Sequence, residues 1–169
     1  MAAYIFDQRF SGNKRQYLLQ CILATVSAML VLMVLNTMAN KVVIASLGAS
    51  CFIVFCVPHH RASTSRFLIG GYTVGIAAGT LCYWLAGVPW PDSVSFLQSH
   101  SDVIFGGLAI GLAMFLMVVT NTEHPPAASL ALGLVLGEWH LLTVAVAMVE
   151  IVILCILKKL LKPLLINLL

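Results

Sequence analysis

The chain has 169 residues, of which 61% are hydrophobic and only 9% are Asp, Glu, Lys or Arg, with a net charge of +3 and a mean hydropathy of +1.03. A soluble domain is about 45–50% apolar and about 25% charged. These proportions argue against a soluble enzyme, and the lack of a basic stripe argues against nucleic-acid binding. At ~20 residues per span, the length suits one membrane domain of about six or seven helices with short loops.

Six apolar segments follow one another along the chain, at residues 18–39, 42–57, 67–87, 103–120, 125–137 and 141–157. The second and the fifth are shorter than an ordinary span of ~17–25 residues, so each is a thin crossing, a half-helix or a re-entrant segment. We expect an all-α, polytopic transmembrane helix bundle of about six segments, two of them short. It would occupy residues 18–160, between an N-terminal segment at 1–17 and a short tail at 161–169.

The positions of the basic residues predict the topology of these segments. If all six segments cross and the N-terminus is cytoplasmic, every Lys and Arg except Lys41 lies on the cytoplasmic side. This set comprises Arg9, Lys14, Arg15, Arg61, Arg66, Lys158, Lys159 and Lys162. A re-entrant second or fifth segment would move the loop or tail bases outside. The rule therefore favours six crossings with both termini cytoplasmic. The absence of a cleavage site or an organellar transit segment indicates a bacterial inner membrane.

A weak internal repeat relates the two halves of the chain. Its copies read Asn36-Thr37 then Ala45-Ser46-Leu47, and Asn121-Thr122 then Ala128-Ser129-Leu130. Three crossings in each half would make this a 3+3 inverted repeat with a short helix at equivalent positions, an arrangement typical of transporters. The alternative is a chance match in a chain rich in Ala and Leu.

Glycines at four-residue spacing mark two smooth helix faces. They are Gly71, Gly75 and Gly79 in the third segment, and Gly107 and Gly111 in the fourth. Because lipid offers the same apolar contacts as a neighbouring helix, membrane helices associate through close backbone approach at small residues. We expect both faces to mediate helix packing, within one subunit or between subunits of a homo-oligomer.

Glu150 lies near the middle of the last apolar segment. A carboxyl group inside hydrocarbon is expensive, so it usually faces protein or a water-filled cavity. One interpretation is a neutral Glu that hydrogen-bonds a neighbouring helix. The other is a carboxyl that couples transport to proton movement.

The densest polar cluster precedes the short fifth segment. It comprises Asn121, Thr122, Glu123, His124, Pro125, Pro126 and Ser129. Proline suits the first turn of a helix, and the free N–H groups there form a natural anion site. His124 could add charge or carry a proton near neutral pH. The alternative is an ordinary helix cap on a cytoplasmic turn.

A matching polar cluster precedes the second segment and includes Asn36 and Lys41. Lys41 is either a lone interfacial lysine or a residue that attracts an anion. The chain contains no P-loop, GxSxG or HExxH motif and no ligand spacing typical of a metal site. We therefore expect neither an enzyme nor a bound metal or cofactor.

The string EHPPAASLAL at residues 123–132 resembles the name-giving motif of the HPP family of small integral membrane proteins. A second block agrees, with LGAS at 47–50 followed by Arg66 and Gly70-Gly71. The resemblance extends from about residue 13 to 157. The chain departs from the family pattern at Ser65, where a proline is common, and at Tyr72, where a histidine is common.

The resemblance implies a permease for nitrite or a related small inorganic anion, because cyanobacterial and chloroplast members are linked to nitrite transport. It places the site at His124, Pro125 and Pro126 with Ser129, and its counterpart in the first half at Gly48, Ala49 and Ser50. Coupling to protons would involve Glu150 or His124. The alternative is a non-transporting membrane subunit that docks a partner protein. The expected partners are the lipid bilayer, the anion and further copies of the chain.

Overall fold

The computed structural model describes residues 8–35, 41–91, 95–137 and 139–168, and these residues form seven α-helices and two short 3-10 helices without a strand. The α-helices are α1 (Gln8–Leu35), α2 (Lys41–Cys56), α3 (Ser65–Ala86), α4 (Ser95–Ser99), α5 (Ser101–Thr120), α6 (Pro125–Leu136) and α7 (Leu141–Leu161). The 3-10 helices are η1 (Arg61–Ser63) and η3 (Lys162–Leu164). The all-α prediction is confirmed, and six of the seven α-helices overlap the six apolar segments, although α1 begins at Gln8, ten residues before the predicted start at residue 18.

Four helical stretches are long and apolar enough to cross a membrane, namely Gly12–Met33, Ser65–Ala86, Ser101–Thr120 and Leu141–Leu164. At 1.5 Å per residue, the 16 residues of α2 and the 12 of α6 reach only about 24 and 18 Å. Both are shorter than a hydrocarbon core of about 30 Å. The structure thus has long and short apolar helices in the order that the sequence predicts.

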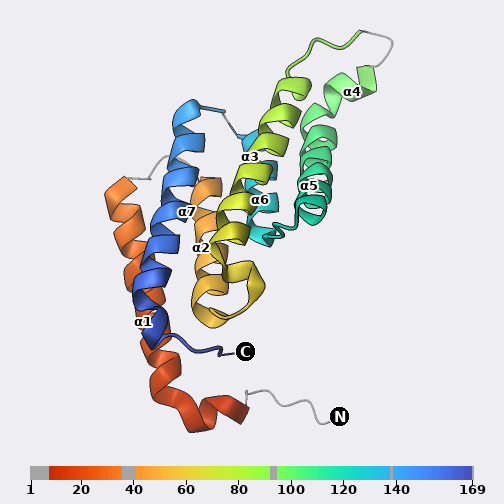
Figure 1. Cartoon of the computed structure of the whole chain (residues 1–169). Helices are drawn as coiled ribbons and strands as arrows, with labels where there is room; N and C mark the ends of the chain where they lie inside the picture. Colours follow the sequence, from red (N-terminus) through yellow and green to blue (C-terminus); the bar gives the residue numbers. More distant parts are fainter. Residues whose placement is uncertain (1–7, 36–40, 92–94, 138, 169) are drawn as a thin grey trace.

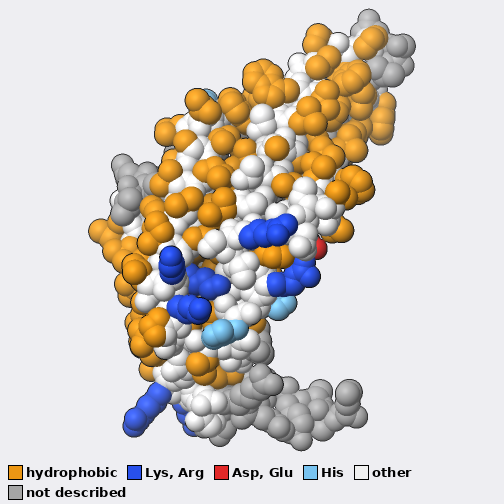
Figure 2. All heavy atoms as spheres, viewed as in Figure 1, with side chains coloured by type: hydrophobic (Ala, Val, Ile, Leu, Met, Phe, Trp, Pro, Cys, Tyr) orange, Lys and Arg blue, Asp and Glu red, His pale blue; other side chains and the backbone are white. Residues whose placement is uncertain are grey.

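The six apolar helices alternate in direction along the chain, so that the start of α1 and the end of α7 lie at the same end of the bundle (Figure 1). We call this the basic end, because the Lys and Arg side chains visible in Figure 2 gather on this half of the molecule. Figure 1 also shows α2 and α6 running in opposite directions, as an inverted repeat requires. The repeat itself stays a prediction.

The opposite end of the bundle carries aromatic side chains. The ring of Trp139 lies 6.3 Å from that of Tyr83 and 5.9 Å from that of Trp84, and its indole N–H donates to the Thr80 hydroxyl at 3.1 Å. Trp and Tyr are enriched at membrane interfaces, where one part of the ring is wet and the other apolar. The aromatic cluster therefore indicates where this end of α3 meets the membrane surface.

The short helix α6 packs against α2, α3 and α5, and more than half of its side chains are buried. Its contact with α3 depends on glycine. A Cβ atom at Gly79 would lie 2.6 Å from the carbonyl oxygen of Ala131, and one at Gly75 would overlap the carbonyl oxygen of Ala127. The helix-packing prediction is therefore correct for this face.

The glycines of α5 behave differently. A Cβ atom at Gly107 or Gly111 would meet nothing within 4 Å, and both residues are exposed. Within one chain these glycines pack against no other helix. Their predicted role in packing can only be met by a second protein molecule.

The C-terminal residues fold back between α1 and α2. The buried Gln20 side chain donates to the carbonyl oxygens of Phe55 at 2.6 Å and Ile166 at 2.9 Å, and its own oxygen accepts from the Ile166 N–H. The Leu168 N–H donates to the Cys56 carbonyl at 2.8 Å. One buried amide thus satisfies backbone groups of two separate segments and joins them to α1.

Candidate functional site

His124 is the N-cap residue of α6 and is fully buried. Its Nδ1 lies 3.3 Å from the carbonyl oxygen of Ala62, and its Nε2 lies 2.9 Å from Oγ of Ser50. The imidazole therefore connects the turn before α6 with η1 on one side and with α2 on the other.

Ser50 continues this chain of hydrogen bonds to α3. Its Oγ lies 3.0 Å from the hydroxyl oxygen of Tyr72, and both side chains are fully buried. Ser46, one helical turn earlier on the same face of α2, is also buried, and its hydroxyl donates to the carbonyl oxygen of Val43 at 2.9 Å. We call His124, Ser50, Ser46 and Tyr72 the buried polar cluster.

The protonation of His124 sets the direction of these hydrogen bonds. His124 lies in the turn between α5 and α6, and burial lowers its pKa to about 4, partly opposed by the hydrogen bond to Ala62. The ring is therefore neutral at physiological pH. Since a carbonyl can only accept, Nδ1 carries the proton and Nε2 accepts from Ser50. Ser50 in turn accepts from the Tyr72 hydroxyl.

Glu150 lies on α7, and its side chain is fully buried. Neither of its carboxyl oxygens has a hydrogen-bond partner among the described residues. The carboxyl is nevertheless near enough to Tyr72 and Cys51 to interact with both electrostatically. A buried polar group without a partner requires an explanation, and this one lies beside the buried polar cluster.

The first turn of α6 offers fewer free donors than the sequence predicts. Pro125 and Pro126 have no N–H group, and the N–H of Ala127 already donates to the carbonyl oxygen of His124 at 2.9 Å. The expectation of a row of free amide donors at this helix start is therefore wrong. Any anion here would be bound by side chains of the cluster.

An ion pair covers the turn on its solvent side. Arg61 contacts Glu123 at 3.0 Å, donates to the side chain of Asn121, and lies over the ring of Phe67. Asn121 ends α5 in a left-handed conformation with φ of 54°, which Asn adopts more readily than most residues. These contacts join η1 to the turn that carries His124.

Comparison with known protein families identifies the family of this chain. The chain matches the family described as "HPP, transmembrane region" over residues 10–167. It belongs to the HPP transmembrane family.

One curated relative is a transmembrane protein of Dictyostelium discoideum. It is 30% identical over 98 residues, which cover 57% of this chain and 31% of that protein. The chain thus spans about a third of the length of this relative. No solved structure matches the chain significantly.

The HPP motif contributes one of its polar residues to the buried polar cluster. His124 and Pro126 are buried, whereas Pro125 and Ser129 are exposed. In the first-half block, Ser50 binds His124, whereas Gly48 and Ala49 on the same helix are exposed. The hydrogen bond between Ser50 and His124 therefore joins the two HPP blocks, and Gly71 of the second block packs closely against the His124 side chain.

The other predicted site residues lie around this cluster or outside the described residues. Thr122 is buried, and its hydroxyl lies 2.8 Å from that of Thr120. Lys41 is the first residue of α2, but its side chain is outside the part of the chain that the structure describes, as is Asn36.

Tyr72 belongs to the site but was not predicted as a site residue. Its signal in the sequence is the departure from the HPP pattern, in which a histidine is common at this position. The structure gives the departure a physical meaning, because the Tyr72 hydroxyl supplies a hydrogen-bonding group to Ser50.

Proposed function

We propose that this HPP protein is a permease for a small inorganic anion, most simply nitrite, and not an enzyme. The observation that carries the proposal is the buried polar cluster with an unpartnered carboxyl beside it, among helices that are otherwise apolar. Polar and ionisable groups in such surroundings typically mark a substrate or proton pathway. The family resemblance supports nitrite as the substrate.

The cluster supports anion binding through its hydroxyl groups. Ser50 and Tyr72 each hold one rotatable O–H, and both now donate within the cluster. An anion that reached the cluster would accept hydrogen bonds from these two hydroxyl groups. They would then no longer donate to Nε2 of His124 and to Oγ of Ser50. The basic end attracts anions toward the membrane, since Arg61 and Arg66 lie around the turn that bears His124.

The proposed coupling follows from the cost of moving charge through a low-dielectric region. An anion that crosses together with a proton carries no net charge, so the penalty of an isolated buried ion is avoided. Glu150 is the proposed proton carrier, because its carboxyl oxygens are buried and unpartnered. His124 is the second proposed proton acceptor, because its ring is neutral and its Nε2 carries no proton.

Uptake of nitrite into proteoliposomes tests the proposal. We expect uptake above that of protein-free liposomes and stimulation by an inward proton gradient. Tyr72→Phe and His124→Ala should lower the initial rate about tenfold or more, the size of effect typical of a positioned acid, base or donor. Thr73→Val is the matched control, because it removes a neighbouring hydroxyl that is exposed on α3 and bonded to its own helix.

Two outcomes would contradict the proposal at different levels. Uptake equal to that of protein-free liposomes between about pH 5 and 8 would contradict nitrite transport. A Glu150→Gln variant with an unchanged rate and an unchanged pH profile would contradict proton coupling through Glu150. It would not contradict nitrite transport itself.

A second candidate function is a non-transporting subunit that docks a partner through α5. The exposed Gly107 and Gly111, with the exposed side chains of Leu108 and Phe115 on the same helix, favour it. This function predicts co-purification with a partner and no flux in liposomes. Flux by the purified protein alone would contradict it.

A further inference from the structure

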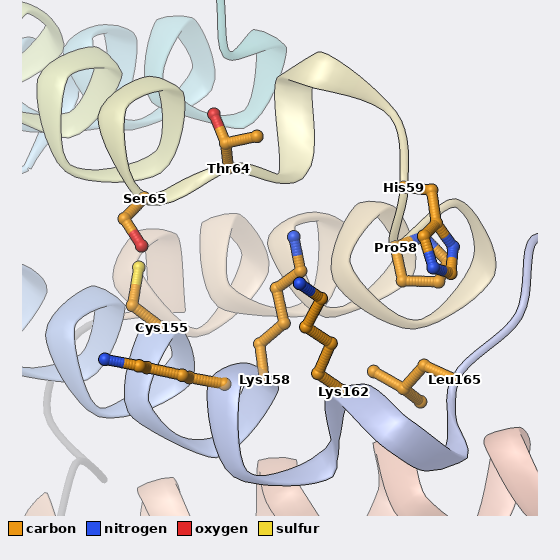
Figure 3. A pocket seen from close by; sticks show the side chains of 9 residues that line it. Pro58, His59, Thr64, Ser65, Cys155, Lys158, Lys162 and Leu165 are labelled. Atoms are coloured by element: carbon orange, nitrogen blue, oxygen red, sulfur yellow. The ribbon is translucent and has the colours of Figure 1, made fainter.

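A pocket of about 370 Å³ opens at the basic end, and none of its lining residues belongs to the buried polar cluster. It lies between the end of α7, the loop after α2 and the start of α3, as Figure 3 shows. Its charged lining comprises Lys158, Lys159 and Lys162, with His59 on the opposite side. Its volume falls in the range of about 300–1,000 Å³ typical of small-ligand pockets.

The pocket has an excess of positive charge. Among the residues that the structure describes, no Asp or Glu lines it, and Glu123 is paired with Arg61 of η1. Lys158 and Lys162 point to the same side of the pocket in Figure 3 and are near enough to repel each other. An anion placed between the two ammonium groups would relieve this repulsion.

The charge is also held in place. The ammonium group of Lys158 donates to the backbone oxygen and to Oγ of Ser63, the latter at 2.8 Å. Ser63 is fully buried and its hydroxyl donates to the Pro58 carbonyl at 2.7 Å. Lys158 is therefore positioned by neutral acceptors that leave its charge uncompensated, whereas Lys159 and Lys162 are exposed.

The walls of the pocket combine this charge with apolar surface. Pro58, Cys155 and Leu165 are buried and line it, and Ile156 and Leu160 are exposed on the same stretch of α7. Lysine binds phosphate groups as a compact point charge, and basic clusters next to a membrane helix attract anionic lipids. The shape and charge therefore suit a phosphate group at the end of an apolar span.

We propose that this pocket binds a phosphate group, carried by an anionic lipid headgroup or present as free phosphate, between Lys158, Lys159 and Lys162. The site is separate from the proposed transport pathway, and nothing in it depends on the substrate that the protein carries. Its occupation would hold α7 against η1 and the loop after α2, because Lys158 already joins these segments.

Thermal unfolding of the purified full chain in nonionic detergent tests the site, since a ligand that binds the folded state raises the unfolding midpoint. Short-chain phosphatidic acid, short-chain phosphatidylcholine and inorganic phosphate are titrated separately. We expect phosphatidic acid to raise the midpoint and the zwitterionic phosphatidylcholine to leave it unchanged. If inorganic phosphate raises it equally and competes, the ligand is free phosphate. If only the lipid acts, the ligand is a headgroup.

The variant Lys159→Gln/Lys162→Gln removes two of the three charges but keeps the contact of Lys158 with Ser63. At the strength usual for a lysine near an anionic surface, it should weaken the apparent affinity roughly 30-fold. Lys14→Gln/Arg15→Gln is the charge-matched control, because both side chains are exposed on α1 and outside the pocket. Three results would overturn the proposal. They are an unchanged affinity in Lys159→Gln/Lys162→Gln, an equal loss of affinity in the control, and no stabilisation by phosphatidic acid or by inorganic phosphate. These results measure binding, so they leave the transport proposal unaffected.

Discussion

The side chain of His124 shows how one residue joins segments that are far apart in the sequence. Its two ring nitrogens contact Ala62 in η1 and Ser50 in α2. The sequence suggested a histidine that changes its charge near neutral pH. Burial lowers its pKa to about 4 instead, so His124 acts as a neutral hydrogen-bonding residue unless acid or a substrate changes its surroundings.

This pKa predicts an acid-dependent loss of stability. The folded-state pKa is about 4, below the ordinary histidine value of about 6.5. The unfolded chain therefore binds the proton more readily, and stability is lost as the pH falls from about 6.5 to 4, by an amount on the order of 3 kcal/mol. The thermal unfolding midpoint should fall over this range in the native protein and fall less in His124→Gln.

His100→Gln is the control for this measurement. His100 is exposed in the turn before α5, so its variant should keep the pH dependence of the native protein. Equal slopes for the native protein and His124→Gln would contradict the burial of a neutral histidine. All groups other than His124 contribute equally to the pH dependence of the native protein and of His124→Gln. The difference between the two slopes therefore reports on His124.

The elements of the bundle are held together by close backbone approach. On α3, Gly75 and Gly79 face backbone atoms of α6 that cannot move aside as a side chain would. On α5, Gly107 and Gly111 face open space. The two faces look alike in the sequence, and only the neighbouring helix distinguishes them.

Alanine substitution should separate the two faces. Gly75→Ala introduces a Cβ atom that overlaps the Ala127 carbonyl. Overpacking of this kind typically costs about 1–3 kcal/mol, so the unfolding midpoint should fall by several degrees. Gly111→Ala introduces its Cβ into open space and should leave the midpoint of the isolated chain nearly unchanged. A smaller loss in Gly75→Ala than in Gly111→Ala would contradict the packing of α3 against α6.

A larger substitution at Gly111 bears on the oligomeric state. If copies of the chain associate through α5, a bulkier residue at Gly111 should reduce the apparent mass in size-exclusion chromatography. Gly111→Leu tests this, and an unchanged elution volume would show that the glycines of α5 make no contact between subunits.

The predicted elements agree closely with the observed helices. The segment expected at 125–137 is α6, Pro125–Leu136, and the one expected at 103–120 is α5, Ser101–Thr120. Apolar runs bounded by prolines and polar residues determine these limits locally. The five-residue helix α4 and the 3-10 turn η1 were not predicted. Both are too short to carry a hydrophobic period, and η1 is positioned by Ser63 and Lys158.

At the scale of the whole molecule, the six apolar helices gather the Lys and Arg side chains visible in Figure 2 at one end and the rings of Tyr83, Trp84 and Trp139 at the other, with Lys41 at the start of α2 as the exception among the basic residues. The first turns of α1 lie at the basic end, whereas α4 lies at the opposite end (Figure 1). The positive-inside rule then predicts that the basic end is cytoplasmic.

Thiol labelling of intact bacterial cells tests this orientation. In a variant without native cysteines, single cysteines replace Asn13, Ser95 or Leu164, which are all exposed. An impermeant reagent should label Ser95→Cys directly, and Asn13→Cys and Leu164→Cys only after permeabilisation. Labelling of Ser95→Cys from the same side as Asn13→Cys would show that α2 does not cross, and labelling from the same side as Leu164→Cys would show the same for α6.

The amino-acid sequence by itself determined the membrane class, the six apolar helices and the family, and it drew attention to His124 as part of the HPP motif. Each of these depends on the hydrophobicity of a local segment or on a contiguous motif. The tertiary structure decided that Ser50 faces the cluster while Gly48 does not, and that Tyr72 belongs to the site. It also decided that only one glycine face packs within the chain. In lipid every face of a helix can be apolar, so the sequence carries little information on helix rotation. Rotation is set by contacts with neighbouring helices, and these exist only in the folded bundle.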